Sequence, residues 1–158
     1  MARYLCVIER NPEGGFDGYA VDLGVFVVGK DTKEEVIESL QKGLALHILE
    51  LQEHGQEVPQ PVAQTAKDDP LGDSMALVHR DVEGELVWLE PATINPVSIA
   101  LEHLLSEAKI SQAEVARRLG VSRAVISRML DPFAPDYKVS SLERIARAVG
   151  KRLEIHFA

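Results

Sequence analysis

The N-terminal part of the chain contains three short runs of strand-forming residues. Residues 3–10, RYLCVIER, are apolar at their centre, and residues 16–23, FDGYAVDL, alternate between apolar and more polar positions. An alternation with a period of two is typical of a half-buried strand. The turn NPEGG separates these two runs, and residues 25–29, VFVVG, form a third. The pattern predicts three strands of one small sheet.

A long helix is predicted next. Thr32 and Glu35 have the spacing of a capping box, in which each side chain accepts a hydrogen bond from a backbone N–H that the first turn leaves unpaired. Gly55 is a suitable end, because glycine adopts the left-handed conformation that closes many helices. The predicted buried face consists of apolar residues at helical spacing: Val36, Leu40, Leu44, Ile48 and Leu51.

A loop and two further strands are predicted after this helix. Residues 58–73 contain three prolines and little periodicity, which favours a loop. Residues 74–82, SMALVHRDV, and residues 84–90, GELVWLE, predict strands on either side of a turn. The pattern leaves open which of these two strands pairs with the N-terminal sheet.

The C-terminal part of the chain predicts four helices in quick succession. Asn95 and Pro96 are suited to cap and start the first of them, since the N–H that proline lacks would be unpaired in the first turn anyway. A capping box at Ser140 and Glu143 predicts the start of the last helix, and Gly150 predicts its end.

A final strand is predicted over residues 152–157, RLEIHF, where apolar and charged residues alternate. A lone strand is not stable, so this one must join the N-terminal sheet or pair with its own copy in a second subunit. A homodimer, or a higher even oligomer, is therefore expected. The predicted dimerisation residues are the apolar ones: Leu153, Ile155 and Phe157.

Residues 111–129 have the spacing of a helix-turn-helix. Ser111 and Glu114 form a second capping box, Gly120 supplies a tight turn, and Ser122 starts the next helix. The small side chain of Ala116 leaves room for two helices to cross at a short turn. The residues predicted to face inward are Val115, Ala116, Leu119, Val121, Ile126 and Met129.

The outward face of the second helix is the candidate DNA-binding surface. A helical bundle with surface arginines is the structural alternative, but the joint placement of small, glycine and apolar residues favours DNA binding. Residues 96–150 resemble the repressor-type helix-turn-helix of bacterial regulators. The candidate contacts to base edges and phosphates are Gln112, Ser122, Arg123, Ala124, Ser127 and Arg128.

Charge divides the chain into two halves. The formal net charge is −8, but residues 1–95 hold 7 Lys/Arg against 18 Asp/Glu, a net charge of −11, whereas residues 96–158 hold 10 against 7, a net charge of +3. Such asymmetry indicates two modules with different partners. We therefore predict an acidic domain over residues 1–92 and a DNA-binding and dimerisation domain over residues 93–158.

Composition favours a soluble protein in a reducing compartment. The hydrophobic content of 46% is ordinary for a globular chain, and the single cysteine, Cys6, cannot form an internal disulfide. The N-terminal apolar run is too short for a signal peptide or a membrane helix. We expect a cytoplasmic protein that does not associate with a membrane.

The acidic half offers little catalytic chemistry. Its four carboxylates near predicted strand ends would suit a Mg²⁺-dependent nuclease, or they are ordinary solvated charges: Glu9, Asp17, Asp22 and Asp31. His47 and His54 lie seven positions apart on the predicted helix, with no third ligand beside them. Since no Ser/His/Asp set or phosphate-binding loop is visible, we expect no enzyme, no metal and no cofactor.

The acidic half resembles the N-terminal domain of HicB antitoxins. The shared motifs are Gly14-Gly15-Phe16, Asp22-Leu23, the entry from Gly29 to Thr32 into a Glu-rich helix, and Pro59-Gln60-Pro61. Two details differ: many members follow Asp-Leu with Pro-Gly-Cys where this chain has Gly24-Val25-Phe26, and the helix entry is one residue longer. Helix-turn-helix members of the family also resemble residues 96–158.

The resemblance implies an α+β chain: a small sheet-plus-helix domain like a trimmed ribonuclease-H fold, then an all-α helix-turn-helix domain with a C-terminal strand. It implies an antitoxin of a type II toxin–antitoxin system that neutralises HicA, a small basic mRNA-cleaving toxin, and represses its own operon. A ligand-sensing helix-turn-helix regulator and a ribonuclease-H-like nuclease are the alternatives. The predicted toxin contacts are Glu9, Asp17, Asp22 and Phe26.

Overall fold

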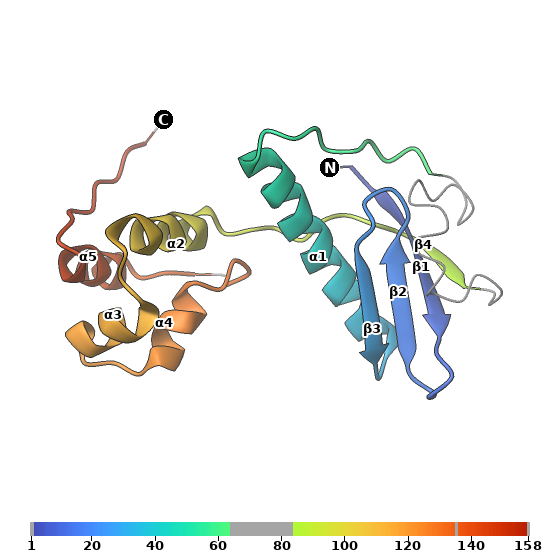
Figure 1. The fold of residues 1–158 in the computed structure, drawn as a ribbon, viewed down its shortest axis with the longest axis horizontal. Coiled ribbons are helices and arrows are strands. Elements are labelled where there is room, and N and C mark those ends of the chain that lie inside the picture. Colours follow the sequence, from blue (N-terminus) through green and yellow to red (C-terminus); the bar gives the residue numbers. More distant parts are fainter. Residues whose placement is uncertain (1, 64–83, 135, 158) are drawn as a thin grey trace. The chain divides into compact units, whose positions relative to one another are not determined.

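The computed structural model describes residues 2–63, 84–134 and 136–157. The chain folds as two compact units, Met1–Thr93 and Ile94–Ala158. Strands and one long helix make up the first unit, and helices make up the second (Figure 1). Within the described ranges, no helix combines the length and the apolar character that crossing a membrane requires.

The described residues of the first unit contain a four-stranded antiparallel sheet in the order β3-β2-β1-β4. Its strands are β1 (Tyr4–Arg10), β2 (Phe16–Ala20), β3 (Phe26–Lys30) and β4 (Glu85–Leu89). The three predicted N-terminal strands are confirmed, and the strand within residues 84–90 is the one that pairs with β1. The strand predicted over residues 74–82 lies outside the described residues.

Strand β2 is shorter than predicted, because it ends at Ala20 and residues 21–23 form a turn. The N–H of Gly24, which has a φ of +63°, donates to the carbonyl of Ala20 at 3.1 Å and reverses the chain toward β3. Val21 and Leu23 are buried within the turn itself. Because these two buried residues alternate with polar ones, the sequence pattern wrongly predicted that the strand continues to residue 23.

Helix α1 (Lys33–Glu53) packs against one face of the sheet. The Thr32 side chain accepts from the N–H of Glu35 at 3.2 Å, as predicted. The Glu35 carboxylate accepts from the N–H of Asp31, one residue before the position expected of a capping box. The core between helix and sheet contains apolar residues from both: Tyr4, Cys6, Ile8, Ala20, Leu23, Val36, Leu40, Leu44 and Leu89.

Gly18, at the centre of β2, sets how closely α1 approaches the sheet. A Cβ atom built at Gly18 would lie 2.5 Å from Cγ1 of Val36 and 3.1 Å from Cδ1 of Leu40. Both of these side chains are fully buried. Any side chain at Gly18 would therefore push the helix and the sheet apart.

We expect Gly18→Ala to lower the free energy of unfolding of the first unit by about 1–3 kcal/mol, the usual cost of overpacking a close-packed core. Denaturant unfolding followed by circular dichroism measures this change. Glu57→Ala, at an exposed site of the same unit, serves as the control and should change stability by less than about 0.5 kcal/mol. Equal stability of Gly18→Ala and the wild type would contradict the packing described here.

In the described part of the second unit, four helices form a bundle: α2 (Pro96–Ala108), α3 (Gln112–Leu119), α4 (Arg123–Met129) and α5 (Val139–Ala148). The predicted cap of α2 is confirmed, since Asn95 Oδ1 accepts from the N–H of Val97 at 3.0 Å. The prediction of an α+β chain with four C-terminal helices is therefore confirmed. The buried core of this unit contains Leu101, Leu105, Val115, Ala116, Ile126, Ile145 and Val149.

The predicted start of the last helix is wrong by two residues, because the predicted cap was Ser140. Helix α5 begins at Val139 with Lys138 at the cap position, and no side chain caps it there. Ser140 therefore lies inside the first turn and does not form the predicted box with Glu143. Tyr137 anchors the preceding loop by donating from its hydroxyl to the carbonyl of Met129 at 2.6 Å, so the chain enters the helix before Ser140.

The predicted C-terminal strand is not formed in the single chain. Residues 151–157 have no regular secondary structure, and the sheet of the first unit contains only β1 to β4 among the described residues. The expectation that this segment joins the N-terminal sheet is therefore wrong for the single chain. Because a strand requires a paired neighbour, pairing with a second copy stays a prediction.

Candidate nucleic-acid interface and protein-binding face

Helices α3 and α4 are joined by a tight turn at Gly120. Gly120 has a φ of +65° and follows the last residue of α3, and the N–H of Val121 donates to the carbonyl of Ala116 at 3.0 Å. The predicted inward positions are confirmed. Val115, Ala116 and Ile126 are buried, and three further apolar residues pack against them: Leu119, Val121 and Met129.

An ion-pair and hydrogen-bond network fixes α3 against α5. The Glu114 carboxylate accepts hydrogen bonds from Arg117 and Arg118, and these bonds lower the pKa of Glu114 to about 2. Arg118 also donates to the carbonyl of Ala148 at 2.6 Å. From the other side, Arg144 donates to the carbonyl at the end of α3 at 3.1 Å. These arginines therefore stabilise the helical bundle. They hold α4 in place indirectly, through α3.

The exposed side of α4 presents the candidate DNA contacts. Ser122, Arg123, Ala124, Ser127 and Arg128 are all exposed, and Gln112 at the start of α3 is partly exposed. The guanidinium of Arg128 has one hydrogen bond, to the carbonyl of Ala124 at 3.4 Å. Among the described residues, neither Arg123 nor Arg128 forms an ion pair. Both charges are therefore available to an anionic partner.

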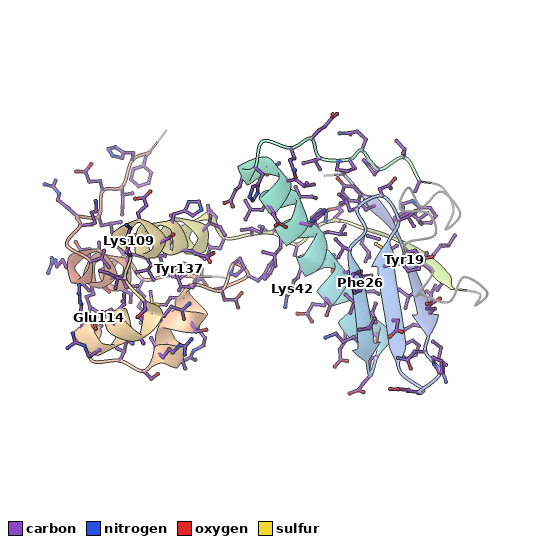
Figure 2. The ribbon with its side chains drawn as sticks, viewed as in Figure 1. Tyr19, Phe26, Lys42, Lys109, Glu114 and Tyr137 are labelled. Atoms are coloured by element: carbon purple, nitrogen blue, oxygen red, sulfur yellow. The ribbon has the colours of Figure 1, made fainter. Side chains whose placement is uncertain are left out.

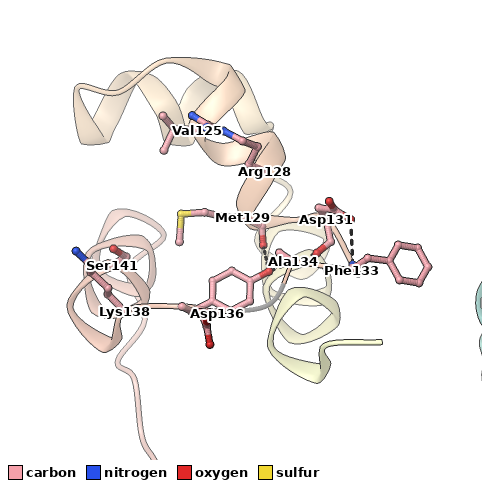
Figure 3. A pocket seen from close by; sticks show the side chains of 10 residues that line it. Val125, Arg128, Met129, Asp131, Phe133, Ala134, Asp136, Lys138 and Ser141 are labelled. Carbon is pink, nitrogen blue, oxygen red and sulfur yellow. Dashed lines mark hydrogen bonds between the residues drawn. The ribbon is translucent and has the colours of Figure 1, made fainter. Parts of the chain in front are cut away.

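A cavity of about 490 Å³ adjoins the end of α4 (Figure 3). Arg128 and Met129 line it from α4, and Lys138 and Ser141 line it from α5 and its cap. The loop between the two helices is held in place by Asn95, whose side chain donates to the carbonyl of Ala134 at 2.8 Å. Lys138 is exposed, and it adds a third cation on this side of the unit that the sequence analysis missed.

The predicted toxin contacts of the first unit have unequal exposure. Glu9 and Asp22 are 6% and 7% exposed, and the Asp22 carboxylate accepts from the N–H of Ala63 at 3.1 Å. The Asp17 carboxylate accepts from the N–H of Gly29 at 2.7 Å and so ties β2 to β3. Three of the predicted contacts therefore have structural partners or are buried. Phe26 is 59% exposed (Figure 2).

The face of the sheet opposite α1 carries exposed apolar residues that the sequence analysis missed. The registers place Leu86, Val7, Tyr19 and Phe26 in one row across all four strands. The row is exposed at both ends, at Leu86 and at Phe26. We call the exposed part of this surface the outer face, and its members are Phe26, Val28, Leu86 and Trp88. Between these exposed residues the same face carries a buried cluster of Leu5, Val7, Val21 and Ala63, so the outer face consists of two exposed apolar edges, one on β3 and one on β4.

Of the candidate catalytic carboxylates, Glu9 and Asp17 lie opposite each other on β1 and β2. Among the described residues, no group of three or more His, Cys, Asp or Glu side chains could hold a metal ion. His47 lies 3.7 Å from the Glu50 carboxylate, whereas the ring of His54 contacts the Glu50 carbonyl. Each of these histidines therefore has a local partner of its own on α1.

Comparison with known proteins finds relatives for both units. Residues 100–154 match the Cro/C1-type HTH DNA-binding domain. The chain is 33% identical over 84 residues to the antitoxin HicB of Pseudomonas fluorescens, an alignment that covers 53% of each protein. It is 23% identical over 153 residues to antitoxin HicB 1 of Photorhabdus laumondii, covering 97% of this chain and 85% of that protein. The chain thus spans about half the length of the first relative and most of the second.

Proposed function

We infer that this chain, which is homologous to HicB antitoxins over most of its length and carries a Cro/C1-type helix-turn-helix domain, neutralises a HicA-type toxin and represses its own operon. The observation that carries the proposal is the pairing of two units with different surfaces. One has an acidic composition and an exposed apolar face, and the other has free arginines on α4. Both relatives are antitoxins, and we accordingly propose no enzymatic activity for this chain.

The second unit is proposed to bind operator DNA through α4. Arg123 and Arg128 would contact phosphates or guanine edges, with Lys138 as a further phosphate contact. The net charge of −8 does not oppose this, because screening limits attraction and repulsion to about 8–10 Å at cellular salt. The local charge of α4 therefore decides binding.

The first unit is proposed to cover the toxin with its outer face. A basic toxin would associate quickly with a unit whose net charge is −11, since complementary charge steers the encounter. Charge alone gives little affinity once it is screened. Phe26 and Trp88, which are 59% and 49% exposed, supply aromatic groups of the kind that dominate binding energy in protein interfaces.

The finer fold assignment also belongs to this proposal. A sheet with one helix on one face is compatible with the trimmed ribonuclease-H-like domain that the family resemblance implies. The described cavity beside α4 lies in the helical unit and has charges of both signs around it. It therefore does not favour the sensor alternative, which calls for an apolar pocket in the acidic unit.

The proposal predicts that a small basic protein encoded beside this chain arrests growth when expressed alone and is harmless when the two are co-expressed. The purified pair should elute as one complex, and the complex should shift DNA from upstream of its own operon. Growth curves, gel filtration and a gel-shift assay measure these results. A neighbouring product that is not toxic, or that does not bind this chain, would contradict the proposal.

A further inference from the structure

Helix α4 is short, so its direction depends on what holds its two ends. Its seven residues follow the turn at Gly120, and among the helices α3 provides its main packing contact. A helix of this length makes few backbone hydrogen bonds of its own, and contacts with its surroundings hold it in place. The contacts at its other end, at Met129, therefore influence where the neighbouring Arg128 lies.

Tyr137 holds this C-terminal end of α4. Its hydroxyl donates to the carbonyl of Met129, the last residue of the helix, at 2.6 Å (Figure 3). The last carbonyls of a helix have no partner within the helix, so this bond satisfies one of them. The ring of Tyr137 packs against the buried core of the unit. Tyr137 thus ties the residue beside Arg128 to that core.

A buried hydroxyl on α2 holds Tyr137 in turn. Ser98 is fully buried, and its hydroxyl donates to the carbonyl of Asn95 at 2.7 Å. Burial raises the pKa of Tyr137, and a hydrogen bond with Ser98 acts in the opposite direction. The Tyr137 hydroxyl therefore keeps its proton at neutral pH and can donate it to the carbonyl of Met129.

The start of α2 also holds the loop that follows α4. The N–H of Asn95 donates to the carbonyl of Pro132 at 2.7 Å, and its side chain donates to the carbonyl of Ala134 at 2.8 Å. The end of α4 and the loop after it are therefore both bound to one support, the N-terminal end of α2. Tyr137 is the link between this support and α4.

We propose that Tyr137 is a positioning residue for DNA binding, which holds the end of α4 so that Arg128 reaches the DNA together with Arg123. The inference rests on the proposed function, because it concerns the operator contacts of α4. A bidentate contact to a base edge requires close alignment of the guanidinium, and interface side chains must be held within about 0.5 Å of the productive position. Phosphate contacts carry no sequence information. Release of the helix end should therefore reduce specificity more than general affinity for DNA.

The ratio of two affinities tests this role in the full chain. Tyr137→Phe keeps the ring and removes only the hydroxyl. We expect it to weaken binding to a duplex from upstream of the chain's own operon by about 5- to 10-fold, and to change binding to a scrambled duplex of equal length by less than about twofold. Fluorescence anisotropy with each labelled duplex measures both affinities. Partial unfolding would lower both affinities equally, so the ratio distinguishes positioning from a loss of stability.

Two control variants accompany this test. Tyr4→Phe removes a hydroxyl that donates to the carbonyl of Pro59 at 3.2 Å in the first unit, and it should leave both affinities unchanged. Ile145→Val removes one buried carbon atom from α5 and so costs stability without removing a hydrogen bond to α4. It should leave the ratio of the two affinities at the wild-type value.

The outcomes separate this inference from the proposed function. A wild-type ratio in Tyr137→Phe, or an equal fall in both of its affinities, would overturn the positioning role, while a wild-type preference for the operon duplex would still support the proposed function. Ser98→Ala is a second test variant and should lower the ratio in the same direction, and a wild-type ratio there would overturn the part assigned to α2. A wild type that binds both duplexes equally would contradict the proposed function, and this inference with it.

Discussion

Replacing Arg123 and Arg128 together by alanine is expected to abolish the operator shift while cells stay protected from the toxin. A lost bidentate base contact costs about 1–3 kcal/mol and a lost phosphate contact weakens binding to every sequence, so the pair should weaken DNA binding on the order of 100-fold. Both residues are exposed on α4, outside the core of the helical bundle. The fold should therefore survive, and growth rescue should remain at the wild-type level.

The salt dependence of DNA binding gives the same experiment a second readout. Each phosphate contact that is lost reduces the slope of log K against log salt by about one, whereas a lost base contact relaxes specificity at one position. Arg3→Ala with Arg10→Ala is a matched control, because it removes two positive charges from the acidic unit instead. If α4 decides DNA binding, this control leaves the shift unchanged. Loss of both DNA binding and protection in the Arg123/Arg128 variant, with a native circular dichroism spectrum, would contradict the division of labour between the units.

Phe26→Asp is expected to abolish protection from the toxin while operator binding persists. The side chain is 59% exposed on the edge strand β3, so an aspartate is tolerated there by the fold. In an interface it would put an unpaired charge in place of an aromatic anchor, and such changes cost 2 kcal/mol or more, roughly a 30-fold or greater loss of affinity. Calorimetry with the purified toxin measures the loss.

Leu46→Asp is the matched control for this experiment. Leu46 is 42% exposed on α1, which lies against the other face of the sheet. The same chemical change there should leave toxin binding intact. If Leu46→Asp failed and Phe26→Asp protected cells, the toxin would bind on the helix side, and the outer face would have to be abandoned as its site.

Local patterns predicted those features of the fold that depend on neighbours along the chain. Thr32 and Ser111 each accept from an N–H three residues later, so both helix starts could be read from a short window. The turn at Gly120 could likewise be predicted from the residues on either side of it. Ser140 and Glu143 have the same sequence pattern but do not form a capping box. The reason lies outside the local sequence, because Tyr137 fixes the preceding loop through a hydrogen bond to Met129 in a different helix.

The candidate protein-binding site depended on contacts that sequence spacing does not contain. Asp22 was a candidate toxin contact, but its carboxylate binds the N–H of Ala63, 41 residues further on. Trp88 was recognised as part of a strand, yet its exposure follows from the pairing of β4 with β1. The exposure of the α4 arginines was easier to predict from the sequence, since the periodicity of one helix is enough to place them on its outward side.

Cys6 provides a natural probe of local unfolding in the first unit. The thiol is fully buried in the core under α1, and burial raises its pKa to about 12. A thiol in this state does not react with alkylating reagents, so labelling requires β1 or α1 to move away first. Because the chain has one cysteine, the labelling rate measures the free energy of that opening without any engineered probe. If the proposed toxin covers the outer face, its binding should slow this labelling. Alkylation would then measure how strongly the partner protects the protein from unfolding and proteolysis.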